Sequence, residues 1–106
     1  KTKENIKGIA HITGGGLTEN VPRILPDRCT ANIDRSSWPS LPVFDTIKEL
    51  GNIDTSEMYR AFNMGIGMVF IIEKNSLNAV TNSLKRITPV YEIGEITNGD
   101  NLTRYI

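Results

Sequence analysis

Three consecutive glycines, at positions 14, 15 and 16, follow a short apolar run that contains the only histidine of the chain, His11. Glycine buries no side chain and loses more conformational entropy on folding than other residues, so we do not expect the triplet to be a packing device. It favours a place where the backbone must approach another group closely. The usual group is a phosphate, held by free N–H groups at the N-terminus of a helix. The segment therefore predicts a strand, an anion-binding turn with His11 at its rim, and a helix.

Length and composition narrow the classes of protein to consider. The 106 residues fit one domain and leave no room for two. Twelve basic and twelve acidic residues cancel without forming a charge run, so we expect neither nucleic acid nor a membrane as a partner. The longest apolar stretch, residues 66–72, is too short to span a bilayer. The single cysteine, Cys29, excludes an internal disulfide, favours a reducing compartment and is predicted to be an inert buried thiol.

Apolar spacing predicts an α+β fold with the order β-α-β-α-α-β-α-β-β and a single mixed sheet with helices packed on it. Strands are predicted over residues 6–13, 29–34, 66–72, 90–96 and 102–106. Helices are predicted over residues 17–25, from 42 to a stop at 51, over a short stretch after 54, and over 76–87.

Three local patterns refine this prediction. Residues 66–72 are apolar on both faces, as in a central strand that is covered on both sides. The turn signal at residues 98–100 predicts that the last two strands form a hairpin. Asp54 followed by Glu57 resembles a capping box, and we expect Arg60 to pair with Asp34 or Glu57. Four aromatic residues are expected to pack in the core or against another domain: Trp38, Phe44, Tyr59 and Phe62.

Five segments, taken together, resemble one known family. They are AHITGGGL at residues 10–17, ENVPRILP at 19–26, IDRSSW at 33–38, EMYRAFNMGIGM at 57–68 and IGEI at 93–96. Each segment alone is a weak signal. In this order and spacing, and over nearly the whole chain, they are similar to the C-terminal domain of phosphoribosylformylglycinamidine cyclo-ligase, the aminoimidazole ribonucleotide (AIR) synthetase family.

The resemblance implies a function and a setting. It implies ATP-dependent ring closure of formylglycinamidine ribonucleotide to AIR in de novo purine biosynthesis, in the cytoplasm. It also implies a three-layer domain partly like ferredoxin folds, ATP and Mg²⁺ as cofactors of the full-length enzyme, and a homodimer. Residues 1–106 are then a partial C-terminal domain that begins at Lys1 without a methionine. The N-terminal ATP-binding domain is its missing partner, so we expect the fragment alone to be inactive.

The resemblance and the glycine turn together select candidate site residues. His11 is predicted to be catalytic, either as a proton relay or as a hydrogen-bond donor to a phosphate. The predicted substrate- or phosphate-binding residues are Thr13, Gly14, Gly15, Gly16, Asn20, Arg23 and Asn63. No cluster of His, Cys or Asp has metal-ligand spacing, so we predict no metal site within this segment.

Each candidate also has an ordinary structural interpretation. The glycines suit a tight turn, Thr13 a strand, Asn63 a helix-to-strand turn and Arg23 a solvated surface. At the level of the chain, two alternatives to the enzyme remain open. One is a stand-alone phosphate-binding module, which predicts ligand binding by this chain alone. The other is a structural or dimerisation domain, which predicts an exposed apolar patch and no response to ligands.

Overall fold

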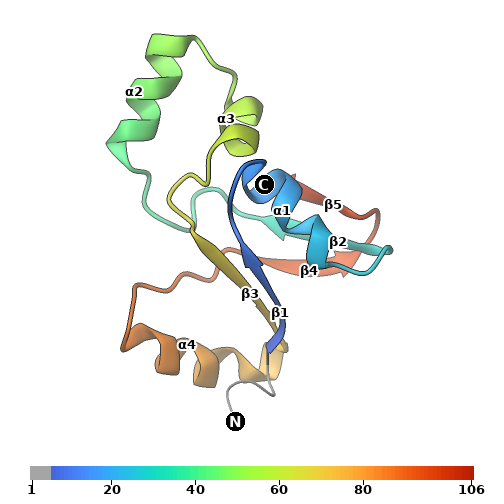
Figure 1. Cartoon of the computed structure of the whole chain (residues 1–106). Coiled ribbons are helices and arrows are strands. Elements are labelled where there is room, and N and C mark those ends of the chain that lie inside the picture. Colours follow the sequence, from blue (N-terminus) through green and yellow to red (C-terminus); the bar gives the residue numbers. More distant parts are fainter. Residues whose placement is uncertain (1–5) are drawn as a thin grey trace.

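A computed structural model describes residues 6–106 of the chain and confirms the α+β fold class (Figure 1). Its strands are β1 (Ile6–His11), β2 (Cys29–Ile33), β3 (Met68–Ile72), β4 (Gly94–Asn98) and β5 (Leu102–Tyr105). Its helices are α1 (Gly16–Asn20), α2 (Pro42–Gly51), α3 (Thr55–Ala61) and α4 (Leu77–Lys85), with 3-10 turns η2 (Pro22–Ile24) and η3 (Lys74–Ser76). The described residues measure 45 × 33 × 21 Å along their principal axes.

The strands form two sheets, so the prediction of a single sheet was wrong. β1 pairs with β3 in an antiparallel ribbon, whereas β2 lies at the centre of the order β4-β2-β5. β4 runs antiparallel to β2 and β5 runs parallel to it. The two C-terminal strands occupy both edges of β2, so β2 is not available to pair with β1 or β3.

The last two strands do not form the predicted hairpin. β2 is inserted between β4 and β5, so the chain turns around the start of β2 instead of folding back on itself. The Gly99 N–H donates to the Arg28 carbonyl at 2.9 Å, and the Asn101 side-chain amide donates to the carbonyls of Pro22 and Leu25 at 3.1 and 3.2 Å. These bonds tie the β4–β5 connection to the η2 region.

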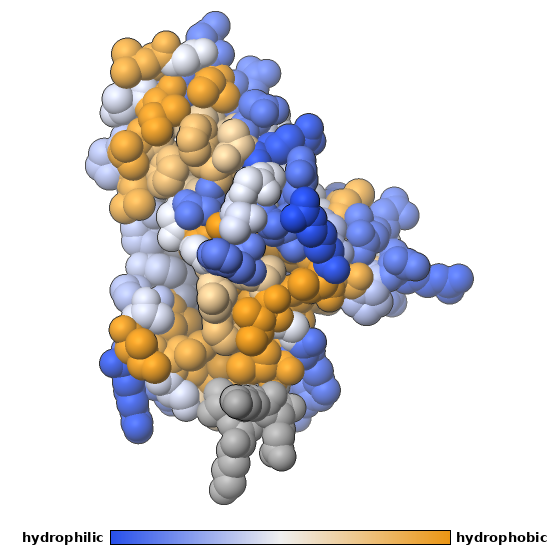
Figure 2. Space-filling model, viewed as in Figure 1, coloured by the Kyte–Doolittle hydropathy of each residue, from blue (hydrophilic) through white to orange (hydrophobic). Residues whose placement is uncertain are grey.

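β3 is an edge strand and not the covered central strand that its composition suggested. Its only strand partner within residues 6–106 is β1, and the Met68 side chain is 51% exposed. Val69 and Ile71 pack against the core, whereas Met68 and Ile9 of β1 leave apolar surface on the outside. Figure 2 shows one such apolar region over the lower half of the molecule and another over its upper part. Both faces of the strand are apolar, although only the face with Val69 and Ile71 packs against the core.

The core lies between α1 and the two sheets. Leu17 of α1 is fully buried, and the Thr103 hydroxyl of β5 donates to its carbonyl at 3.1 Å. Figure 1 shows α1 in front of the β4-β2-β5 sheet. α1 is short because Pro22 has no N–H to continue the helix, and η2 follows it. The cluster of buried apolar residues consists of Ala10, Ile12, Leu17, Val21, Leu25, Ala31, Ile33, Trp38 and Ile66.

Of the two helices between β2 and β3, α2 lies toward the periphery, whereas α3 buries Met58, which is only 1% exposed. α2 has no buried residue, and its Leu50 is 85% exposed. α3 begins after Asp54, but the Asp54 side chain makes no capping hydrogen bond, so the predicted capping box is absent. Of the four aromatic residues expected in the core, Trp38 is buried and Phe44, Tyr59 and Phe62 are half-buried. Cys29 is also only partly buried. Within residues 6–106, no helix has the length and apolar content needed to cross a membrane.

Candidate functional site

The glycine triplet forms a tight turn between β1 and α1. Gly15 and Gly16 have φ values of 99° and 59°, a region that side-chain-bearing residues rarely adopt. The Gly16 N–H donates to the Thr13 carbonyl at 2.9 Å and closes the turn. The predicted sequence of strand, glycine turn and helix is therefore present.

Gly16 contradicts the expectation that the glycines do no packing. It is buried, and a Cβ atom at this position would collide with the backbone carbonyls of Tyr59 and Phe62 at the end of α3. Gly14 differs, because it is exposed and no atom lies within 4 Å of where its Cβ would be. The inner side of the turn thus packs against α3, while the outer side remains open to an approaching group.

Asn20 holds the turn from the inside. Its side-chain amide donates to the carbonyls of Thr13, Gly14 and Gly16 at 3.2, 3.3 and 2.9 Å. The residue is only 6% exposed. Asn20 was predicted to bind substrate or phosphate. In the structure its amide donors are instead engaged by the turn itself. It acts on the candidate site by fixing the path of the backbone.

Arg23, Glu19 and Arg60 form a charged group beside the turn. One guanidinium nitrogen of Arg23, Nη1, donates to the Asn20 side-chain oxygen at 3.0 Å, and the other, Nη2, lies 4.0 Å from the Glu19 carboxylate. Arg60 of α3 lies 3.8 Å from the same carboxylate. The expected pairing of Arg60 with Asp34 or Glu57 is therefore wrong, because α3 packs against α1 and its arginine reaches Glu19. The glutamate to arginine spacing of four residues in 19–23 was a sequence signal for part of this group.

His11 and Thr13 lie on the outer side of the same region. His11 is the last residue of β1, is exposed, and pairs across the ribbon with Met68. Thr13 is also exposed, and its backbone carbonyl is the one used by Gly16 and Asn20. Together with Gly14 these residues form an accessible surface at the end of the β1–β3 ribbon.

Asn63 belongs to a turn that adjoins this surface. Its side-chain oxygen accepts a hydrogen bond from the Gly65 N–H at 2.8 Å, so it stabilises the turn between α3 and β3. The next residue, Met64, has an unusual positive φ of 54° and accepts a hydrogen bond from the Trp38 indole at 3.0 Å. The Ile12 N–H donates to the Gly67 carbonyl at 2.9 Å and joins the two turns.

A pair of tyrosines lies near α1, and only one of them, Tyr59, was singled out from the sequence. The rings of Tyr59 and Tyr105 have centroids 4.9 Å apart, and the Arg35 guanidinium lies 5.9 Å from each centroid. The Tyr105 hydroxyl lies 2.8 Å from the Thr18 hydroxyl. Burial raises the pKa of both phenols above the ordinary value, and the positive charge of Arg35 acts in the opposite direction. The cluster fastens α1, α3 and β5 together.

Hydrogen bonds from its neighbours lower the pKa of the Asp34 carboxyl below its ordinary value. The Ser36 hydroxyl donates to it at 2.6 Å and the Ser36 N–H at 2.9 Å, and both bonds favour the charged form and lower the pKa of Asp34. Because the side chain is fully exposed, this arrangement shapes a turn after β2 and does not indicate catalysis.

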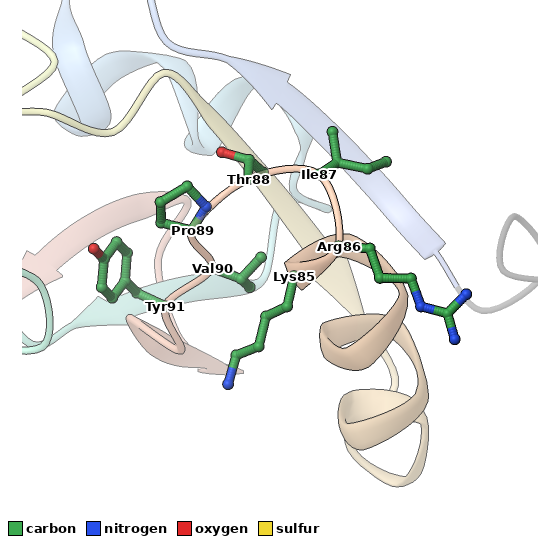
Figure 3. Close-up of a pocket in the computed structure, with 7 residues that line it drawn as sticks. All are labelled: Lys85, Arg86, Ile87, Thr88, Pro89, Val90 and Tyr91. Carbon is green, nitrogen blue, oxygen red and sulfur yellow. The ribbon is translucent and has the colours of Figure 1, made fainter.

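Two surface depressions of the described residues lie away from the glycine turn. One of about 480 Å³ is lined by residues 85–91, the segment between α4 and β4. Figure 3 shows Arg86 directed away from Tyr91 there, so the polar groups of this segment do not converge. No predicted site residue lines it. Among residues 6–106, no group of three or more His, Cys, Asp or Glu gathers in a way that could hold a metal ion.

An α+β domain with two sheets and an open glycine turn after its first strand defines the class of this chain. It belongs to the family described as AIR synthase related protein, C-terminal domain, which matches residues 1–106. The family predicted from the sequence motifs is thereby confirmed.

The relatives with similar sequences carry purine-biosynthesis names. A phosphoribosylformylglycinamidine cyclo-ligase of Acetivibrio thermocellus is 48% identical over 99 residues, covering 92% of this chain and 29% of the relative. A cyclo-ligase of the same name from Bifidobacterium longum subsp. infantis is 48% identical, covering 87% of this chain and 27% of the relative. A bifunctional purine biosynthetic protein, purD, of Dictyostelium discoideum is 45% identical over 94 residues, covering 88% of this chain and 12% of the relative. The chain thus spans less than a third of the length of the curated relatives that it matches.

Proposed function

We propose that this chain forms part of an AIR synthetase that closes the imidazole ring of AIR from formylglycinamidine ribonucleotide with ATP. The full-length enzyme would use Mg²⁺, act in the cytoplasm and form a homodimer, with an N-terminal domain that binds ATP. Membership of the family over residues 1–106 and the names of the relatives support this proposal. Because the described residues offer no set of metal ligands, no step is assigned to Mg²⁺ on this chain.

The observation that carries the proposal is the two-sided construction of the glycine turn. Its inner side is fixed by the bonds of Asn20 and by the contact of Gly16 with α3. Its outer side exposes Gly14 with open space in front of it, next to the exposed Thr13 and His11. A rigid backbone with an open outer face suits the binding of a phosphate or phosphoryl group, because its N–H groups need not be reordered when the anion arrives.

We assign His11 a role in proton transfer during ring closure. In the proposed reaction the formyl oxygen takes a phosphoryl group from ATP, a substrate nitrogen attacks the formyl carbon, and the carbon–oxygen bond breaks to release phosphate. The attacking nitrogen must then lose a proton. An exposed imidazole at the rim of the phosphate-binding turn is placed to accept it. Asn20 is a positioning residue in this scheme, since its side chain contacts the turn and not the ligand.

The test places this chain in a complete enzyme. The matching segment of the Acetivibrio thermocellus cyclo-ligase, which is 48% identical, is replaced by this chain, and AIR formation is measured. We expect the chimaera to turn over substrate and His11→Ala to lower kcat by about 10²-fold or more. Because the His11 side chain is exposed, the melting temperature should stay unchanged.

Lys7→Ala is the matched control, because Lys7 is exposed on the same strand as His11 but pairs with Glu73 at 3.0 Å, near the other end of that strand. It should leave turnover unaltered. A folded chimaera without turnover would contradict the proposed function. Normal turnover with a lower melting temperature in His11→Ala would show instead that the histidine is structural.

A further inference from the structure

Two arginines from different elements converge on one carboxylate at the glycine turn. Arg23 follows α1 and Arg60 lies on α3, and both reach Glu19. The nitrogen–oxygen distances of 4.0 and 3.8 Å are longer than a hydrogen bond, so neither guanidinium is satisfied by this carboxylate. All three side chains are about half exposed or more, and ion pairs of this kind contribute little to stability.

Glu19 covers the Gly15 part of the turn, beside the open face at Gly14. Its carboxylate oxygen Oε1 lies 2.7 Å from the position that a Cβ of Gly15 would occupy, so the side chain lies directly against the glycine backbone. The space next to Gly15 is thus occupied by an anionic group of the protein, and each of its two carboxylate oxygens has an arginine within 4.0 Å.

The charges of these three side chains do not balance. Arg23 and Arg60 contribute two positive charges and Glu19 one negative charge, which leaves an excess of one positive charge in a chain that is neutral overall. Arg23 is also oriented in advance, because Nη1 is bonded to Asn20 while Nη2 has only the distant contact with Glu19. A guanidinium held in this way is suited to a phosphate, which accepts two parallel N–H bonds.

We propose that Arg23 and Arg60 form a binding site for a phosphate group at Gly15, and that Glu19 occupies this site in the free protein. An arriving phosphate carries more charge and more acceptor oxygens than a carboxylate, so it displaces Glu19 and takes both arginines. The inference rests on the proposed function and names the side chains that bind its phosphate. The phosphate belongs either to a sugar phosphate substrate or to the phosphate chain of a nucleotide.

The test is a titration of the ¹⁵N-labelled chain with inorganic phosphate, ribose 5-phosphate and tripolyphosphate, followed by the amide signals of residues 14–16. We expect all three to bind at the turn, with the tighter of the last two identifying the source of the phosphate. Arg60→Gln and Arg23→Gln should each weaken binding by about tenfold. Glu19→Gln should strengthen it, because the competing anion is removed while the shape of the side chain is kept.

Arg28→Gln is the matched control, since Arg28 is exposed and forms no ion pair within residues 6–106. Three results would overturn the site. They are unchanged binding by Arg60→Gln, weaker binding by Glu19→Gln, and the absence of binding by both the wild-type chain and Glu19→Gln. The chimaeric enzyme separates this outcome from the larger proposal. Turnover in the chimaera together with no anion binding at residues 14–16 would reject the arginine site and retain the function.

Discussion

At the scale of single residues, the three consecutive glycines do three different things. Gly14 faces open space, Gly15 lies under the Glu19 side chain with a φ of 99°, and Gly16 is buried against the end of α3 with a φ of 59°. A glycine triplet therefore need not have one purpose. Here one position is required by packing and backbone conformation, whereas another is free of both constraints and is available to a ligand.

Substitution by alanine should separate these roles. Gly16→Ala forces a Cβ into the carbonyls of Tyr59 and Phe62 and places a side chain at positive φ, so we expect a loss of about 2–4 kcal/mol in the free energy of unfolding. Gly14→Ala meets no neighbouring atom within 4 Å and should change that free energy by less than about 0.5 kcal/mol. Urea unfolding of the two variants is the measurement, and equal losses would contradict the two-sided description of the turn.

At the scale of elements, local patterns predicted the kind of element well and its neighbours poorly. Pro42 begins α2, as its fixed φ favours, and Pro22 ends α1. Gly51 is the last residue of α2, but the left-handed cap expected of a glycine is adopted by Asn52, with a φ of 51°. The apolar β3 was placed at the centre of a sheet because its composition is the same whether its second face is covered or exposed. The turn at residues 98–100 was interpreted as a hairpin because a turn sequence does not reveal that β2 is inserted between the strands it connects.

At the candidate site, too, the sequence predicted individual residues but not the contacts between elements. The sequence pointed to the turn itself, to His11 and to Arg23, because glycine clusters and single titratable residues are visible in a linear pattern. It did not reveal that Asn20 binds the turn from within or that Arg60 reaches Glu19. Both facts depend on how α1 and α3 pack together, and no spacing within the sequence encodes that packing.

At the scale of the whole molecule, the tyrosine cluster joins elements that are far apart in the chain. Tyr59 comes from α3 and Tyr105 from the C-terminal strand β5, and Tyr105 also contacts Thr18 of α1. A change in the ionisation of these phenols should therefore affect the stability of the entire fold.

This coupling predicts a loss of stability at alkaline pH. Burial raises the pKa of Tyr105 in the folded state, so the unfolded chain releases the phenolic proton first. The contribution of the neutral phenol is complete below about pH 10 and is lost as the pH rises from there through the raised value. Tyr105→Phe should make the free energy of unfolding fall less steeply above pH 10 in urea titrations. Tyr91→Phe, at an exposed position, should retain the steeper fall of the wild-type chain.

The central claim is that the outer face of the glycine turn binds the phosphate of a substrate or nucleotide. The most direct test is an NMR titration of the chain with AIR and then with Mg²⁺–ATP. The account predicts chemical shift changes centred on His11 and residues 14–16, extending to Glu19, Arg23 and Arg60. Changes located elsewhere, for instance along residues 85–91, or no change from either ligand, would contradict it.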